Sequence, residues 1–195
     1  MTQYSLQWLL EETEQGSQFE YLFFWGHTNK SNNPTGDFIF SQWYPSPFTV
    51  DGVIYKTAEH WMMAAKARLF KDFDILDKII HAETPREAKS FGRKVKGFVT
   101  NVWDDNCFQI VVEGNRHKFS QHDAFKEFLL STGRRVIVEA SPVDAVWGIG
   151  LAQNSEQAKD PHHWRGQNLL GFALMQVRDI LQQKPDTALC KDVAH

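Results

Sequence analysis

The sequence predicts an α+β fold in a single domain, mostly helical with a small group of short strands. The chain has 195 residues, which suits one domain with a substantial hydrophobic core. Helical patterns outnumber strand patterns, and the strands do not alternate with helices in the regular order of an α/β sheet. No internal repeat or low-complexity tract divides the chain.

The first third of the chain is expected to hold one short helix and most of the strands. An amphipathic pattern predicts a helix over 5–15, and the aromatic, β-rich run over 19–26 predicts a strand. Turn-forming residues predict a loop over 27–37. Short strands around a hairpin are expected over 38–57, with an Asp-Gly pair as the turn.

The middle of the chain is expected to be helical. Apolar residues at helical spacing predict four helices, over 57–70, 72–82, 85–97 and 103–131. Thr57 is the expected N-cap of the first, and Thr84, Pro85 and Glu87 form a capping-box start for the third. A break in the fourth is expected near 119–122, so that helix is predicted as two pieces.

The last third should add one strand and one helix. A strand is expected over 134–140, a long polar loop over 147–168 and a closing helix over 168–183. Because a loop of this length in a small domain is usually functional or disordered, and two Trp frame it, we interpret it as functional. The expected organisation is an N-terminal extension (1–18), the main domain (19–183) and a tail (184–195).

Composition limits the classes of function. With 21 Lys+Arg against 24 Asp+Glu, a strongly basic nucleic-acid binder is not indicated, although a local basic patch stays open. The sequence lacks a signal-peptide pattern and a long apolar span, so we expect no membrane association, a cytoplasmic location with the nucleus as the alternative, and no obligatory protein partner. The histidines and two cysteines form no ligand pattern and no nucleotide-binding motif occurs, so neither a metal nor a cofactor is expected.

The helix expected over 57–70 is apolar on nearly every side, yet it carries a carboxylate and an amine. Glu59 and Lys66 fall on one face, about 10 Å apart along the axis. Apolar surroundings lower the pKa of a lysine and raise the pKa of a carboxyl, which suits a Schiff-base lysine and a proton-carrying acid. The structural alternative is that each side chain reaches solvent or a separate partner.

A resemblance to a known family enters at these residues. The run FTVDGVIYKTAEHWMMAAKA (48–67) resembles the central motif of the NADAR family of YbiA-like proteins, a G-x-x-Y turn followed by T-x-E-H and A-x-K. The likeness continues in order along the chain, at AKSFGR (88–93), Trp103, KFSQH and LLSTG (118–133), VEASPVDAVWGIG (138–150) and WRGQNLLGFALMQVRDIL (164–181). Two family positions differ, because IFSQWYPSP (39–47) lacks the asparagine of L-S-N-F-Y and WMMAA (61–65) lacks a glutamine.

The resemblance implies the YbiA-like fold and an N-glycosidase. Members of the family are associated with cleaving ribosyl groups from nitrogen, either in phosphorylated ribosylamino-pyrimidine intermediates of riboflavin synthesis or in guanine bases that carry ADP-ribose. In both substrates the sugar C1 is bonded to an exocyclic amino group. Such a glycosylamine can open to an imine, which a neutral lysine can capture.

The resemblance also suggests roles for individual residues. It implies Lys66 as the nucleophile, Glu59 as a proton shuttle, and Asp144 as a second acid/base or a ligand of the ribose hydroxyls. Trp103 and Trp147 are expected either to sandwich a ring or to pack in the core. Other residues are counted with the substrate-binding set: His60 from the T-x-E-H motif, and Glu139, which either assists or faces solvent.

Phosphate contacts are expected from two regions. Gly148 and Gly150 permit close backbone approach to a ligand, and Arg165 and Asn168 precede the last helix, whose N-terminus can attract an anion. Capping by Asn168 is the simpler explanation of that pair. In the helix expected over 85–97, a basic stripe is formed by Lys89, Arg93 and Lys96, with Arg93 the candidate for substrate phosphate and solvated surface the alternative.

Three hypotheses follow. The first is an enzyme that removes ADP-ribose from guanine bases in nucleic acid. The second is the same chemistry on a ribosylamine phosphate of the riboflavin pathway. The third is a non-catalytic module that binds ADP-ribose or NAD, which the presence of Glu59, Lys66 and Asp144 disfavours.

Overall fold

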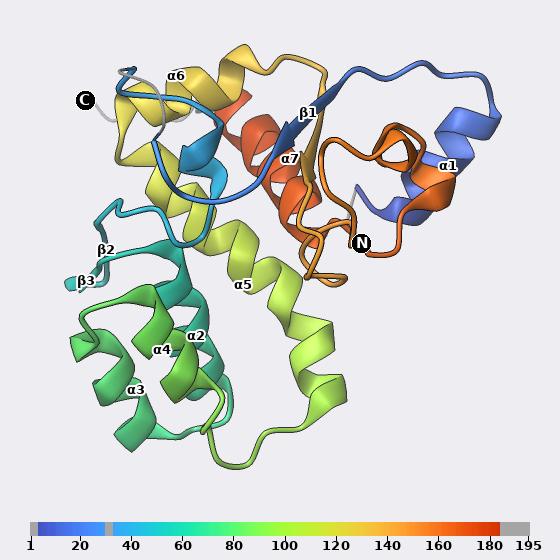
Figure 1. Ribbon diagram of the computed structural model, residues 1–195. Coiled ribbons are helices and arrows are strands. Elements are labelled where there is room, and N and C mark those ends of the chain that lie inside the picture. Colours follow the sequence, from blue (N-terminus) through green and yellow to red (C-terminus); the bar gives the residue numbers. More distant parts are fainter. Residues whose placement is uncertain (1–3, 30–32, 184–195) are drawn as a thin grey trace, which may run out of the picture.

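The computed structural model describes residues 4–29 and 33–183 and shows the expected α+β arrangement, dominated by helices (Figure 1). The α-helices are α1 (Leu6–Glu14), α2 (Ala58–Leu69), α3 (Phe73–His81), α4 (Pro85–Gly92), α5 (Thr100–Ser120), α6 (Asp123–Ser131) and α7 (Leu169–Gln182). The strands are β1 (Tyr21–Phe24), β2 (Phe48–Val50), β3 (Val53–Tyr55) and β4 (Val136–Glu139). Short 3-10 helices lie at η1 (Asp37–Phe40), η2 (Glu156–Lys159) and η3 (Pro161–His163).

The strands form two separate pairs. β1 and β4 are parallel, with Tyr21 opposite Val136 and Phe24 opposite Glu139. β2 and β3 form the expected antiparallel hairpin, and Asp51 and Gly52 supply its turn with φ of 50° and 78°. The first three residues of β4 are buried, and Glu139, the last residue of the strand, lies at the edge of the core.

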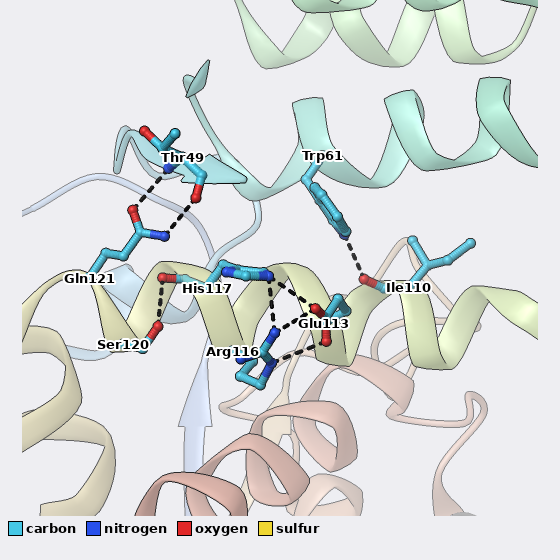
Figure 2. A network of polar contacts seen from close by, with 8 residues as sticks. All are labelled: Thr49, Trp61, Ile110, Glu113, Arg116, His117, Ser120 and Gln121. Atoms are coloured by element: carbon cyan, nitrogen blue, oxygen red, sulfur yellow. Dashed lines mark hydrogen bonds and ion pairs between the residues drawn. The ribbon is translucent and has the colours of Figure 1, made fainter. Parts of the chain in front are cut away.

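Helix α5 runs diagonally through the molecule, with α2, α3 and α4 on one side and β1, β4 and α7 on the other (Figure 1). It packs against both α2 and α7. Figure 2 shows two of its polar ties: the Trp61 indole of α2 donates to the Ile110 carbonyl at 2.8 Å, and the Gln121 amide pairs with the Thr49 backbone at 2.8 and 2.9 Å. α5 therefore links the two sides of the fold.

The core draws side chains from both sides of α5. Fully or almost fully buried residues include Ala64 and Ala67 of α2, Val111 and Phe119 of α5, Ile137 and Val138 of β4, and Phe172 and Leu174 of α7. The N-terminal helix joins this core, because Leu9 is fully buried and the Trp8 ring meets Phe19 and Phe172 edge-on. Residues 1–18 are therefore packed into the fold as far as the structure describes them.

Several element boundaries differ from the sequence expectation. The start of the expected 38–57 hairpin segment is the 3-10 helix η1, and α4 ends at Gly92 instead of continuing to 97. The backbone N–H of Lys96 instead donates to the Asp72 carboxylate at 2.8 Å, so a tertiary contact replaces the last helical turn. The predicted break after 119 is confirmed, with α5 ending at Ser120 and α6 starting at Asp123. The expected tail, 184–195, lies outside the described residues.

Among the helices that the structure describes, we find none with the length and apolar character that crossing a bilayer requires.

Candidate active site

Glu59 is a buried carboxylate at the first turn of α2. Thr57 caps this helix by accepting from the His60 N–H, and the Glu59 N–H donates to the Gln42 carbonyl at 2.9 Å. The side chain is only 2% exposed, and its Oε1 has no hydrogen-bond partner among the described residues. Burial raises the pKa of Glu59 to about 7, against the opposing pull of the Lys89 charge. This carboxyl is therefore partly protonated near neutral pH.

Two further carboxylates lie beside it at the end of β4. Burial first, and then the Asp144 charge, raise the pKa of Glu139 to about 8, and its Oε2 is buried without a partner in the described chain. Asp144 follows in the next loop, where its Oδ1 accepts from the N–H groups of Val146 and Trp147 at 2.9 and 2.8 Å. The charge of Asp144 raises the pKa of Glu59, and the charges of Asp144 and Glu59 both raise the pKa of Glu139. The three carboxyls therefore form one electrostatic cluster.

Cations and an indole offset this negative cluster. Lys89 and Arg93, at the end of α4, both favour the ionised form of Glu59 and so oppose the rise of its pKa, and the Trp43 side chain acts in the same direction. The only donor on that side chain is the indole N–H. The Lys89 amine also lies 5.8 Å from the centre of the Trp43 ring. The site thus combines proton-carrying carboxyls with positive groups suited to an anionic ligand.

Lys66 lies farther along α2 in aromatic surroundings. Its Nζ is 4.2 Å from the centre of the Phe98 ring and 5.3 Å from that of Trp103. Burial lowers the pKa of Lys66, and none of the carboxylates in the described chain contributes to that shift. The structure therefore brings Glu59, Glu139 and Asp144 together, while Lys66 occupies an aromatic position two helical turns away on the same helix.

The glycines near Asp144 serve the protein's own backbone. A Cβ on Gly148 would lie 2.8 Å from the Glu139 carbonyl oxygen, and Gly150 has φ of 65°. The Ile149 N–H donates to the same Glu139 carbonyl at 2.9 Å. The glycines therefore allow the loop after β4 to approach the strand itself, where a ligand had been expected. This packing places Asp144 next to Glu139.

Asn168 does not cap α7 with its side chain. It has a left-handed backbone conformation, with φ of 54°, and its side chain bridges to β4. Oδ1 accepts from the Glu139 N–H and Nδ2 donates to the Ile137 carbonyl, both at 2.9 Å. Asn168 therefore fixes the end of β4, from which Glu139 projects. Arg165 is exposed, and its N–H donates to the Ile149 carbonyl at 2.9 Å.

Other expected site residues have structural partners. Both ring nitrogens of His60 are engaged, by the Thr57 hydroxyl at 2.8 Å and the Ala82 carbonyl at 3.2 Å, and burial lowers its pKa. Trp147 and Trp103 are half-buried against the core. The expected basic stripe is shorter than predicted, because Lys96 lies beyond the end of α4.

Two residues near these groups were not anticipated. Trp43 stands within the segment that resembles L-S-N-F-Y, but its position in the sequence does not reveal that its side chain lowers the pKa of Glu59. Phe98 lies in the loop before α5 and has no motif of its own; it is 41% exposed and its ring lies beside the Lys66 amine. No cluster with the arrangement of a metal site occurs in residues 4–29 and 33–183.

The sequence matches known proteins along most of its length. The model of the NADAR domain matches residues 23–182. The chain belongs to the NADAR family. A protein named N-glycosidase R617 of Acanthamoeba polyphaga mimivirus is 44% identical over 169 residues, which are 84% of this chain and 98% of the relative. N-glycosidase YbiA of Escherichia coli (strain K12) is 32% identical over 147 residues, or 75% of this chain and 81% of that protein.

A solved structure gives the same fold for the family. The NMR structure of the E. coli protein YbiA matches with a TM-score of 0.68 and 27% sequence identity, covering 85% of this chain and 87% of that one. The expected YbiA-like α+β fold is therefore confirmed. The relatives also confirm that this NADAR protein is an enzyme of the N-glycosyl hydrolase class.

Proposed function

We propose that the protein hydrolyses the bond between ribose C1 and an exocyclic amino group, and that its substrate is ADP-ribose attached to guanine in nucleic acid. One observation carries the proposal: Glu59 and Glu139, with pKa values raised to about 7 and about 8, each hold a buried oxygen that has no hydrogen-bond partner in the described part of the chain, close to Asp144. Carboxyls that stay protonated near neutral pH can deliver a proton to a glycosidic bond.

The proposed reaction begins with opening of the sugar ring. Glu59 gives a proton to the ring oxygen, while the lone pair of the exocyclic nitrogen forms a C1–N double bond. The neutral amine of Lys66 adds to C1, and a proton passes to the base nitrogen, which leaves as the free amino group. Water then hydrolyses the lysine–sugar imine, so the net change is the addition of one water across the C1–N bond.

The surroundings of Lys66 support its proposed role. An amine attacks carbon only in its uncharged form, and burial against Phe98 and Trp103 shifts the pKa of Lys66 downward. A ring-nitrogen glycoside cannot form the exocyclic imine, so the route spares unmodified nucleosides. Asp144, whose charge raises the pKa of Glu139, is the proposed ligand of the ribose hydroxyls or the second proton carrier.

The cations support a phosphorylated substrate. Lys89 is half-buried near Glu59 and Arg93 is exposed at the end of α4, where Lys94 and Lys96 continue the positive surface. This exposed extension favours a large anionic substrate such as a nucleic acid. The second candidate, a ribosylamino-pyrimidine phosphate, is favoured by Lys89 alone, since one half-buried cation suits a single phosphate.

A direct comparison of the two substrates tests the proposal. The protein is incubated with an oligonucleotide carrying ADP-ribose on a guanine amino group and, in parallel, with the ribosylamino-pyrimidine phosphate. Wild type, Lys66→Ala and Glu59→Gln are compared, with Lys78→Ala, a change at an exposed lysine of α3, as the control. We expect faster release from the oligonucleotide and a loss of ~10²-fold or more in either site variant.

Each alternative has its own outcome. Faster release from the pyrimidine would assign the second substrate, and tight binding of ADP-ribose without release from either would assign a non-catalytic module. Borohydride reduction during turnover should attach the sugar to Lys66. Turnover without this adduct, unaffected by Lys66→Ala, would replace the lysine by direct attack of water.

A further inference from the structure

Trp25 is an exposed aromatic residue that the proposed chemistry does not use. Its side chain is 60% exposed, whereas the other six Trp of the chain are half-buried or buried. It directly follows the last residue of β1, at the point where the chain leaves the parallel strand pair. A large ring left in water at a strand end draws attention to what surrounds it.

The end of β1 lies at the edge of the fold that carries the carboxyl cluster. Phe24 is paired with Glu139, and the Ala140 N–H donates to the Phe24 carbonyl at 2.9 Å. Because the two strands are parallel, the residues that follow them emerge at the same edge. Trp25 and the loop that carries Asp144 therefore leave the strand pair side by side.

That loop exposes two more apolar side chains. Val143 is 87% exposed and Val146 is 48% exposed, and they stand on either side of Asp144 in the sequence. Single exposed apolar residues are common on protein surfaces, but several at one edge indicate a surface that another molecule covers. We call Trp25, Val143 and Val146 the apolar rim.

A second line of contacts leads from the segment after β1 to the same cluster. The His27 ring lies 5.9 Å from the Trp43 ring, and the Lys89 amine lies 5.8 Å from the centre of the Trp43 ring. The Gln42 carbonyl, one residue before Trp43, accepts from the Glu59 N–H at 2.9 Å. Aromatic rings and a cation thus line the approach to Glu59.

Trp25 stands beside the carboxyls and not among them. Side chains alternate along a strand, so Trp25 continues the face of Tyr21 and Phe23, whereas Phe24 and Glu139 share the other face. A group of the ligand that packs on Trp25 is therefore a neighbour of the reacting group. In a nucleic acid, that neighbour is the next base along the strand.

We infer that Trp25 stacks on an unpaired base next to the modified guanine, and so makes the enzyme prefer a nucleic-acid strand to a free nucleotide. The inference rests on the proposed nucleic-acid substrate. Every base has a flat face that stacks on an exposed aromatic ring, and cations beside such rings hold the backbone phosphates. Lys89, and Arg93 four residues later at the end of α4, supply these cations.

Two substrates with the same modified guanine test the inference. One is a single-stranded oligonucleotide and the other is ADP-ribosylated guanosine monophosphate. Trp25→Ala should lower kcat/KM for the oligonucleotide, relative to that for the mononucleotide, by roughly 5- to 100-fold. Trp25→Phe keeps a ring and should keep most of the preference. Ile54→Ala, at a position on β3 that is 62% exposed, is the matched control and should keep all of it.

Oligonucleotides with one missing base identify the stacked partner. Replacing the base on one side of the modified guanine by an abasic residue should lower kcat/KM of the wild type about as much as Trp25→Ala does. The same replacement should cause little further loss in Trp25→Ala, because the ring and the base act as a pair. Additive losses, or an unchanged preference for the oligonucleotide in a folded Trp25→Ala protein, overturn the inference.

A binding measurement keeps the inference separate from the proposed reaction. An unmodified single-stranded oligonucleotide is added to Glu59→Gln, and the change in tryptophan fluorescence is compared with that of Glu59→Gln carrying Trp25→Phe. Quenching that disappears with Trp25 supports base stacking, even where the wild type cleaves neither substrate and the proposed function fails. If a protein covers the apolar rim instead, neither cleavage nor quenching depends on Trp25, and the inference is wrong.

Discussion

At the scale of single residues, burial of the Glu59 carboxyl supports the proposed proton transfer and lowers the stability of the fold when the carboxyl is ionised. Its pKa lies at about 7 in the folded protein and at the ordinary 4.5 when exposed, so the folded state binds more protons between these values. The protein therefore loses stability as pH rises from about 4.5 through about 7, because an ionised Glu59 is unfavourable where it is buried.

Glu59→Gln should reveal both effects in one protein. We expect a loss of ~10²-fold or more in kcat, since the amide cannot donate an acidic proton. We also expect a gain of roughly 1–3 kcal/mol in the free energy of unfolding above pH 7 and none below pH 4.5. Urea unfolding at pH 4 and pH 8 measures the gain. Equal stability of the variant and wild type at pH 8 would show that the carboxyl is not strained by burial.

Phe98 is expected to keep Lys66 reactive. The ring lies 4.2 Å from the amine and removes water from it, so Phe98→Ser should bring the pKa of Lys66 back toward its ordinary value. We expect about a 10-fold lower rate at pH 7, recovered as the pH is raised, with little change in melting temperature because the ring is 41% exposed. Val99→Ser, at the neighbouring exposed position, is the control, and a pH-independent loss would contradict this role.

At the scale of elements, the start of α2 depends on His60. Its ring bonds the Thr57 cap and the Ala82 carbonyl in the neutral form, and burial lowers its pKa below the ordinary 6.5. The unfolded chain takes up this proton first as pH falls. The stability supplied by His60 is therefore complete above pH 6.5 and declines as pH drops below it.

His60→Gln should accordingly weaken the fold and spare the chemistry. We expect a loss of about 1–3 kcal/mol at pH 8 that shrinks toward pH 5, with kcat per folded molecule within about threefold of wild type. Thermal unfolding across pH measures the first effect and cleavage assays the second. A large loss of kcat without a loss of stability would instead support the substrate-binding role that the family motif implies for His60.

The sequence predicts elements well where the signal is local. The start of α4 at Thr84, Pro85 and Glu87 is encoded by its capping box, and the structure shows that box formed. The end of α4 is not encoded locally, because Asp72 of a different segment takes the Lys96 N–H. Asn168 illustrates the same limit, since helix capping is its usual local role and its bonds to β4 are visible only in three dimensions.

The candidate site shows this division between local and tertiary information most clearly. Glu59 and Lys66 can be found from the sequence because a charged pair on an apolar helix is a local anomaly. Their surroundings cannot, since Trp43, Glu139 and Phe98 come from distant segments that only folding brings to α2. The proximity of Glu139 to Glu59 depends on β4, the loop after it and Asn168 together.

At the scale of the whole molecule, the N-terminal helix is packed into the hydrophobic core. Leu9 of α1 is fully buried, and α1 contacts η3, which belongs to the long polar loop before α7. Residues 1–18, expected from sequence to be an extension, should therefore unfold together with the rest of the chain.

Leu9→Ala tests that cooperativity. We expect a loss of about 2–5 kcal/mol in the free energy of unfolding, through the cavity left behind, and a single transition reported both by tryptophan fluorescence and by loss of activity. Gln7→Ala, at an exposed position of the same helix, should change stability by less than about 0.5 kcal/mol. Two separate transitions in the Leu9 variant would instead identify residues 1–18 as an independent unit.

The parallel pairing of Tyr21–Phe24 with Val136–Glu139 has a consequence for biosynthesis. The first strand leaves the ribosome early, whereas its only paired neighbour in the described chain is translated late. The nascent protein must keep an aromatic, unpaired strand out of aggregates for most of its translation. A chain that stops short of Val136 lacks both the partner strand and Glu139, so we expect interrupted translation to give an inactive fragment that aggregates through the unpaired strand.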